Sequence, residues 1–372
     1  MKSLAGILTA SFAKKALAGS VLAGALYYGA SVLASAEAAE KFKVAWVYLG
    51  PTGDTGWNYQ QFLGQQAVEK EFGDKVETVK VENVPEGADA ERVLTQLARS
   101  GAKMIFCTSF GYMEPALKVA KQFPNVYFEH ATGYKTAPNV STYNARYYEG
   151  AAVQGVLAGK LTKSGIAGFV GSVPIPEVIM TVDAFTIALR KVRPDATVKV
   201  IWLNEWFDPG KEAEATKALM DLGADVITQS TDSPAPVQTA EARGVYAFGT
   251  NSDMAAFGPT HLVTSTVDDW ASYDVARVKA AMNGTWKSEQ TWGGMSADML
   301  SMAPVNKALP ADVAELAAKT AEDLKSGKLL PFAGPIKDQT GKVVVPEGQS
   351  LSDEKILGLN WYVQGIDSQM PK

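Results

Sequence analysis

The feature that most constrains the fold is a regular alternation of short apolar runs with longer stretches of helical period, which begins at residue 43. Strands that alternate with helices form parallel sheets covered by helices on both faces. Runs rich in Val, Ile and aromatic residues mark the strands. We expect them at residues 43–49, 76–82, 103–109, 125–130, 140–145, 166–172, 197–203, 225–230, 244–250 and 261–267.

The series of strands restarts after a helical stretch that follows residue 146, which predicts an α/β protein with two doubly wound parallel-sheet lobes. Lobe 1 is expected at residues 41–145 and lobe 2 at 146–268. A helix near 270–285 is expected to return to lobe 1, and part of 286–310 to join lobe 2. Residues 311–372 cross back between the lobes, and the pattern leaves open which lobe they join.

The first 36 residues have the composition of a secretory signal peptide. Lys2, Lys14 and Lys15 precede a stretch rich in Ala, Gly and Leu that ends in Ala34-Ser35-Ala36, a small-x-small cleavage pattern. An uncleaved membrane anchor is the alternative, because the apolar stretch nearly reaches spanning length. The cleavage pattern favours secretion with removal of the signal peptide, and since no cysteine stands at the cleavage site we expect no lipid anchor.

Charge and cysteine content narrow the partners. The chain carries a net charge of −5, which becomes −8 without the three lysines of the signal peptide, so nucleic acid is an unfavourable partner. The single cysteine, Cys107, excludes an internal disulfide. We expect a monomer that relies on its hydrophobic core.

Loops beyond the carboxyl ends of parallel strands are the usual ligand sites. The first such loop, "GPTGDTGWNYQQFLGQ", brings Trp57 and Asn58 to a helix start, where an indole face stacks on flat rings and an amide reads a ring edge. Packing by Trp57 and capping by Asn58 is the alternative. Ser109 and Phe110 follow the third strand, with helix capping as the alternative role of Ser109.

Lobe 2 offers a similar set of loop residues. Trp206 precedes Asp208, a candidate N-cap, in "WLNEWFDPGKE". Asn251 and Asp253 follow one strand and Asp268 follows another, and the alternative for these acids is ordinary solvation.

The sequence offers few residues suited to catalysis. The chain has two histidines, His130 and His261, without metal-ligand spacing, and Cys107 stands where a nucleophile elbow needs glycine. We therefore expect a binding protein that uses neither cofactor nor metal. A secreted enzyme such as a nucleoside hydrolase is the alternative from another class.

Six segments resemble the basic membrane protein (BMP) family of ABC-transporter substrate-binding proteins, which have the type I periplasmic-binding fold. They are "GDTGWNYQQFLG", "CTSFGYMEPALKVAKQFP", "EGAAVQGVLAG", "WFDPGKEAEATKAL", "ADVITQSTDSPAPVQTAEARGVYAFG" and "TWGGM". The resemblance implies two lobes joined by a hinge, a ligand cleft between them, and a membrane permease as partner. It also implies a purine held between aromatic residues of the two lobes, here Trp57 and Trp206, with Asn58 on the base edge.

Two departures from the family pattern concern the ribose. Nucleoside binders of the family tend to carry an acid where this chain has Asn251, and a lysine where it has Asp268. An acid that faces the ligand accepts hydrogen bonds from ring N–H groups or an exocyclic amine. We therefore expect a free, adenine-like purine base, with Asn58, Asn251, Asp253 and Asp268 at its edge. A nucleoside or a small sugar-like molecule is the alternative.

Overall fold

The computed structural model describes residues 40–53 and 55–371, and residues 41–372 form one compact unit. The expected signal peptide at 1–36 therefore lies outside the described residues. Within them, no helix combines the length and the hydropathy needed to cross a bilayer.

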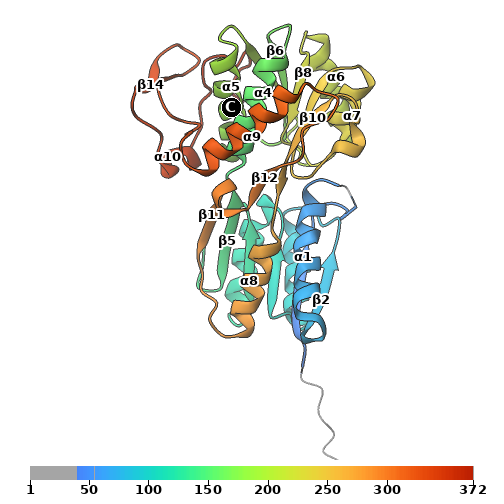
Figure 1. The fold of residues 1–372 in the computed structure, drawn as a ribbon. Helices are drawn as coiled ribbons and strands as arrows, with labels where there is room; N and C mark the ends of the chain where they lie inside the picture. Colours follow the sequence, from blue (N-terminus) through green and yellow to red (C-terminus); the bar gives the residue numbers. More distant parts are fainter. Residues whose placement is uncertain (1–39, 54, 372) are drawn as a thin grey trace, which may run out of the picture. The chain divides into compact units, whose positions relative to one another are not determined.

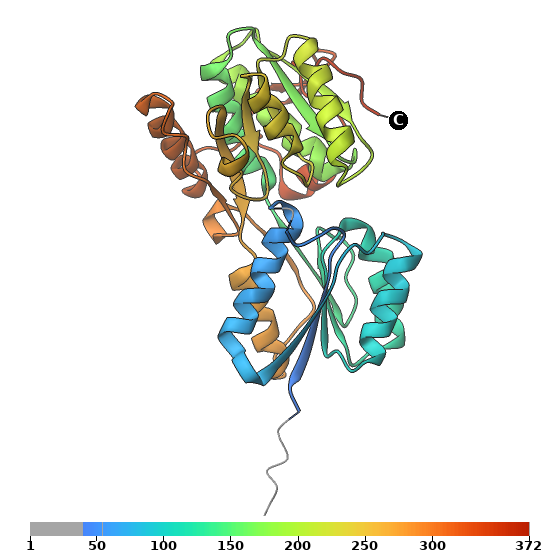
Figure 2. The same cartoon turned by 90° about the vertical axis from the view of Figure 1, so that its right-hand side faces the viewer.

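Lobe 1 is built on a sheet in which all neighbouring strands pair in parallel (Figure 1). Across the sheet the order is β11 (Gln290–Gly293), β5 (Val140–Ala145), β4 (Tyr127–Ala131), β3 (Met104–Cys107), β1 (Phe42–Val47) and β2 (Val76–Val81). Its helices are α1 (Trp57–Phe72), α2 (Ala88–Arg99), α3 (Met113–Gln122) and α8 (Ala271–Met282), with short 3₁₀ turns η1 (Gly73–Lys75) and η2 (Phe110–Tyr112). Figure 2 shows α1 and α8 on one face of the sheet and α2 and α3 on the other.

Lobe 2 repeats this plan with one antiparallel edge strand. Its sheet order is β12 (Leu300–Met302), β10 (Leu262–Asp268), β9 (Tyr246–Gly249), β8 (Val226–Gln229), β6 (Ile166–Gly171) and β7 (Thr197–Trp202), and β12 runs antiparallel to β10. The helices are α4 (Tyr147–Leu161), α5 (Pro176–Val192), α6 (Pro209–Asp221), α7 (Ala235–Ala242) and α9 (Ala311–Lys325), with 3₁₀ turns η3 (Ala255–Phe257) and η4 (Met295–Ala297). The chain thus passes between lobes after β5, after β10 and after β11.

The C-terminal segment, whose lobe the sequence leaves open, packs on lobe 2. Helix α9 lies against α4, and α10 (Asp353–Leu357) lies against α5. The last residues run beside β7, where Val198 N donates to Gly365 O at 2.8 Å and Asp367 N donates to Val198 O at 2.7 Å. A small antiparallel pair, β13 (Ile336–Lys337) and β14 (Val343–Val345), lies within this segment.

Local sequence explains these elements. Residues 44–47 of β1 are buried on both faces of the sheet, which accounts for an unbroken apolar run. In α2 the buried positions follow a helical period: Ala90, Val93, Leu94, Leu97 and Ala98. Asp208 is the N-cap of α6, as the sequence predicts, and accepts from Lys211 N at 3.0 Å. Helix α7 begins at Ala235, directly after Pro234.

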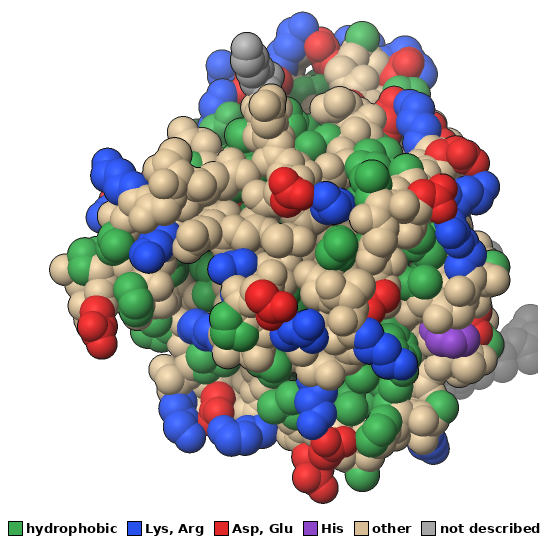
Figure 3. Space-filling model, turned by 90° about the horizontal axis from the view of Figure 1, so that it is seen from above, with side chains coloured by type: hydrophobic (Ala, Val, Ile, Leu, Met, Phe, Trp, Pro, Cys, Tyr) green, Lys and Arg blue, Asp and Glu red, His purple; other side chains and the backbone are tan. Residues whose placement is uncertain are grey.

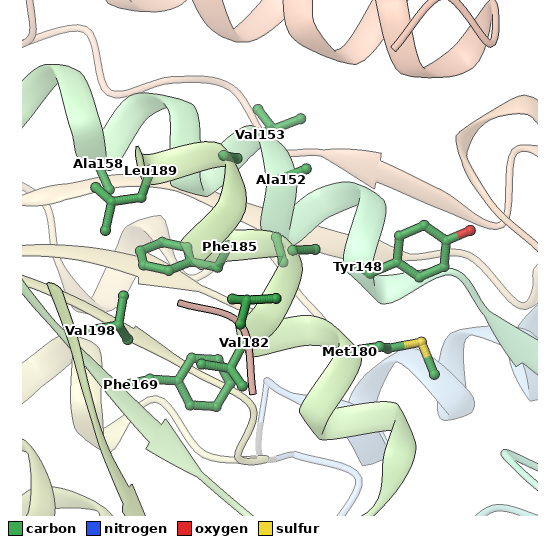
Figure 4. Close-up of a cluster of buried hydrophobic side chains, with 14 of the residues drawn as sticks. Tyr148, Ala152, Val153, Ala158, Phe169, Met180, Val182, Phe185, Leu189 and Val198 are labelled. Carbon is green, nitrogen blue, oxygen red and sulfur yellow. The ribbon is translucent and has the colours of Figure 1, made fainter. Parts of the chain in front are cut away.

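Each lobe has a core on both faces of its sheet. In lobe 2, Phe185 and Leu189 of α5 point toward the sheet, where Phe169 and Val198 meet them (Figure 4). The outer surface of this lobe carries Lys and Arg side chains interspersed with Asp and Glu (Figure 3). This face therefore presents no broad field of one sign.

A buried ion pair fixes the returning helix α8 to lobe 1. Arg277 Nε donates to Glu129 Oε1 at 2.7 Å, and Tyr273 OH donates to Glu129 Oε2 at 2.7 Å. The indole of Trp286 also donates to this carboxylate, at 2.5 Å. Glu129 is fully buried in β4, so its charge depends on these donors.

We predict that Arg277→Leu lowers the free energy of unfolding by about 3–5 kcal/mol, because it leaves Glu129 buried without its cation. Urea denaturation of the ligand-free protein measures this. The exposed pair of Lys319 and Asp323 provides the control, since Lys319→Ala is expected to cost under about 1 kcal/mol. Equal, small losses in both variants would contradict the role given to Arg277.

Candidate ligand-binding site

A cavity of about 60 Å³ lies between the two lobes, where loops from the carboxyl ends of both sheets meet. Lobe 1 and the first residue of α4 supply one part of its wall: Trp57, Ser109, Phe110, Thr132 and Tyr147. Lobe 2 supplies the rest: Glu177, Val178, Thr181, Trp206, Ser230, Asp232, Thr250 and Asn251. Each of these residues follows a strand of its sheet, as expected for a ligand site in an open parallel fold.

Five of the residues singled out from the sequence line this cavity: Trp57, Ser109, Phe110, Trp206 and Asn251. The other three lie off its wall. Asn58 is fully buried and accepts from Gly50 N at 3.2 Å, so its side chain helps to shape the first loop. Asp253 is exposed and accepts from Ala255 N at 3.0 Å at the start of η3. Asp268 is buried behind the wall.

Trp57 is held rigidly in the wall. Its Nε1 donates to Thr108 O at 2.6 Å, and its ring meets Tyr147 and Trp270 edge to face at centroid distances of 6.5 and 5.9 Å. The side chain is 8% exposed. Trp57 is therefore both a core residue and a face of the cavity.

The loop of Ser109 is fixed from two sides. Glu86 Oε1 accepts from Ser109 Oγ at 2.6 Å and from Gly111 N at 2.8 Å. His130 Nε2 lies 2.8 Å from Ser109 O, and burial lowers the pKa of this histidine to about 4, so the ring is neutral and donates. These bonds place Phe110 at the cavity.

Aromatic rings of the two lobes meet across the cavity mouth. Phe110 of lobe 1 and Trp206 of lobe 2 have ring centroids 6.4 Å apart and planes inclined by 54°. Asn251 adopts a left-handed φ of 64°, a conformation that Asn tolerates better than most residues. Its backbone carbonyl accepts from Asp268 N at 2.9 Å, which ties this loop to the end of β10.

The lobes are closed over the cavity through the backbone of Gly56. Ser252 Oγ of lobe 2 donates to Gly56 O at 3.0 Å. A Cβ at residue 56 would lie 1.9 Å from the carbonyl oxygen of Asp232. Only glycine permits this approach, so Gly56 sets how closely the lobes meet.

Glu177 is a half-buried acid on the cavity wall. It lies in the first turn of α5, and Asn144 Nδ2 of β5 donates to its Oε2 at 2.7 Å, across the two lobes. Burial raises the pKa of Glu177 to about 7, and the hydrogen bond from Asn144 offsets part of this rise. The carboxyl group of Glu177 therefore changes between its neutral and its charged form near neutral pH.

Two further unsatisfied groups lie near Glu177. Neither carboxylate oxygen of Asp268 has a hydrogen-bond partner among the described residues, and the same holds for the hydroxyl of Tyr147. Burial, and then the charge of Glu177, raises the pKa of Asp268 well above its usual range. Burial, followed by Asp268 and Glu177, likewise raises the pKa of Tyr147.

The cavity wall is acidic and aromatic. None of the described residues that line it is Lys, Arg or His. No cluster of His, Cys, Asp and Glu suited to a metal ion occurs in the described part of the chain. Such a wall suits flat ligands that carry hydrogen-bond donors, and it disfavours anions.

Sequence reasoning missed Glu177 and Tyr147. Both follow strand ends, β6 and β5 respectively, so the rule that located Trp57 applies to them too. Glu177 comes directly after Pro176 and reads as an ordinary acid in a first helical turn. Its burial against the other lobe has no local signature.

Curated relatives cover most of the chain. A protein named "Purine-binding protein BAB2_0673", from Brucella abortus, is 53% identical over 91% of this chain and 96% of its own length. A protein named "Putative ABC transporter glucose-binding protein TsgA13", from Haloferax volcanii, is 35% identical over 89% of this chain and 82% of its own length.

Solved structures share the fold. An ABC transporter solute-binding protein from Conexibacter woesei superposes with a TM-score of 0.62, 24% identity, and coverage of 77% of this chain and 97% of its own. One from Aeropyrum pernix gives a TM-score of 0.67, 18% identity, and coverage of 79% and 94%. These neighbours show the two-lobed type I periplasmic-binding fold. Residues 41–340 match the family described as "ABC transporter substrate-binding protein PnrA-like" (Bmp), and the chain belongs to this family of ABC-transporter substrate-binding proteins.

Proposed function

We propose that this protein binds a free, adenine-like purine base between Trp57 and Trp206 and delivers it to the permease of an ABC importer. The observation that carries the proposal is a small cavity with aromatic walls and only acidic charge, in a chain 53% identical to a protein named as purine-binding. A signal peptide at residues 1–36 would deliver it to the periplasm as a diffusing monomer.

Cavity size favours a base over a nucleoside. A buried water takes roughly 10–15 Å³ of such space, so a cavity of about 60 Å³ has room for roughly four to six waters. A bicyclic base fits this range, whereas an added ribose about doubles the ligand. The lobes would have to open further to hold a nucleoside.

The chemistry of the wall favours a heteroaromatic ring. Stacking on an aromatic side chain contributes roughly 1–3 kcal/mol per base in other proteins. Phosphorylated ligands are disfavoured, because the described lining set holds two carboxyl groups, those of Glu177 and Asp232, and no cation. Asn251 and Ser109 offer further polar contacts to a base edge.

A sugar is the second candidate, favoured by the name of the Haloferax relative and by the hydroxyl groups of Thr132, Thr181, Ser230 and Thr250 on the wall. Aromatic faces also pack against sugar rings. The two ligand classes differ in planarity, so direct titration separates them.

Closure of the two lobes provides the mechanism. The three chain crossings, after β5, β10 and β11, would act as the hinge, and the closed form would dock on the permease. In the closed form Gly56 of lobe 1 contacts Asp232 and Ser252 of lobe 2. A ligand that bridges both lobes would favour this form by its differential contacts.

The test is a calorimetric titration of protein that has been unfolded and refolded to remove carried-over ligand. The ligands are adenine, guanine, hypoxanthine, xanthine, adenosine, guanosine and glucose. We expect adenine to bind at least about a hundredfold more tightly than adenosine. Tighter binding of a nucleoside or of glucose, or release of free base from adenosine on chromatography, would overturn the proposal.

We predict that Trp206→Ala weakens adenine binding at least about tenfold, because it removes one stacking face worth roughly 1–3 kcal/mol. The side chain is only partly buried and lies in a loop, so the free energy of unfolding should change little. Trp361→Ala is the matched control: it removes another partly buried tryptophan of lobe 2 from outside the cavity. Equal affinities in both variants would remove Trp206 from the site.

We predict that Gly56→Ala weakens adenine binding at least about tenfold, because the added Cβ overlaps the Asp232 carbonyl only when the lobes are closed. Calorimetry gives the affinity, and small-angle scattering with saturating adenine should show a more expanded particle than the wild type. Gly53→Ala, in the same loop, adds a Cβ with no atom within 4 Å and serves as control. Wild-type affinity in Gly56→Ala would exclude this contact from closure.

A further inference from the structure

We propose that Glu177 reads the base with a neutral carboxyl group, which donates its O–H to an unprotonated ring nitrogen and accepts from the exocyclic amine beside it. This inference rests on the proposed function and names the chemical group that the site selects: an amine next to a ring nitrogen, as at the amino-substituted edges of adenine. Nothing is transferred or bonded covalently.

The position of Glu177 supports this role. The residue lines the cavity, and α5 fixes it in the first turn of a helix that begins at Pro176. Asn144 Nδ2 donates to one oxygen, Oε2, at 2.7 Å and so orients the carboxyl group. Among the described residues no hydrogen bond engages the other oxygen, Oε1, and Oε2 keeps a second lone pair. A carboxyl group held in this way presents one donor and one acceptor side by side when it carries a proton.

The surroundings favour the protonated form. The titratable groups whose charges interact with Glu177 are those of Asp268 in β10 and Tyr147 in α4, and Asp232 is the other acid of the cavity wall. None of them is a cation, and no Lys, Arg or His occurs among the described lining residues. Burial raises the pKa of Glu177 from its ordinary value of 4.5 to about 7. Ionising this carboxyl group places a charge in poorly solvated surroundings, which is costly.

The dipole of α5 acts in the opposite direction, because it favours the charged form of Glu177. A carboxylate in the first turn of a helix gains roughly 0.3–1 kcal/mol from the helix dipole at exposed sites. Burial is the largest influence on Glu177 and acts the other way. The neutral form is therefore available at neutral and mildly acidic pH.

A neutral carboxyl group and an amide present the same pattern of one donor and one acceptor. The substitution Glu177→Gln can therefore distinguish a neutral Glu177 from a charged one. Glutamine and asparagine pair with the N6 and N7 atoms of adenine through two hydrogen bonds when they read DNA. If Glu177 is neutral, Glu177→Gln should therefore bind adenine as the wild type does. If Glu177 is a carboxylate, which only accepts hydrogen bonds, this substitution should weaken binding. Glu177→Leu removes both hydrogen bonds while keeping the bulk.

The experiment compares adenine with unsubstituted purine, which lacks the amine, by calorimetry on wild type, Glu177→Gln and Glu177→Leu. We expect Glu177→Gln to keep the wild-type preference for adenine. In Glu177→Leu, adenine binding should fall at least about tenfold and the preference should largely vanish. Asp183→Asn is the matched control. Asp183 is a buried acid of the same helix, and its Oδ1 accepts from Val363 N away from the cavity. Thermal unfolding of each variant monitors folding.

The pH profile gives a second readout. The affinity of wild type for adenine should fall as the pH rises from about 6 to about 8.5, because Glu177 loses its proton through about pH 7. The affinity of Glu177→Gln should stay level over this range, and Asp183→Asn should follow the wild type.

The outcomes separate the two proposals. If the wild type binds none of the purines, the proposed function fails. If it binds adenine but Glu177→Gln behaves like Glu177→Leu, or the wild-type affinity does not fall with rising pH, the purine assignment stands and the neutral-acid role of Glu177 is overturned.

Discussion

The cavity depends on one backbone contact between the lobes. Gly56 is the N-cap of α1, and its lack of a side chain lets the Asp232 carbonyl and the Ser252 hydroxyl of lobe 2 approach the lobe 1 backbone. The contact sets the separation of the two walls, because Trp57 follows directly in α1 and is anchored to Thr108. Ligand size is thus governed by main-chain geometry, while ligand chemistry is governed by side chains on the walls.

Burial without a compensating cation gives the site its electrostatic character. Glu177 and Asp268 lie where the lobes meet, and burial raises the pKa of both carboxyl groups. The buried acid of lobe 1, Glu129, differs because it is paired with Arg277, and this ion pair attaches α8 to the lobe. Glu129 is thus a structural carboxylate whose hydrogen bonds are all made within lobe 1. Among the described residues Glu177 and Asp268 lack such a cation, so each is available to bind a ligand or to take up a proton.

Much of this architecture could be predicted from the sequence, because buried parallel strands and amphipathic helices have distinct periodicities. The two lobes and the aromatic loops at Trp57 and Trp206 follow from strand ends. The path of residues 311–372 could not be predicted, since its packing beside β7 depends on long-range pairing. Trp57 proves to be a core residue as well as part of the cavity wall. Asn58, expected at the ligand, is buried off the wall, whereas Glu177, which the sequence did not single out, lines the cavity, because contacts between lobes leave no local signal.

The return of α8 and β11 to lobe 1 has a consequence for the order of folding. The edge strand of that lobe, Gln290–Gly293, lies far along the chain from its first strand, Phe42–Val47, and all of β6 to β10 intervenes. Lobe 1 therefore cannot be completed before lobe 2 has been synthesised, and its closure requires contacts of long sequence separation, which form slowly. The sheet of lobe 1 therefore reaches its full width only when most of the length of the chain is available.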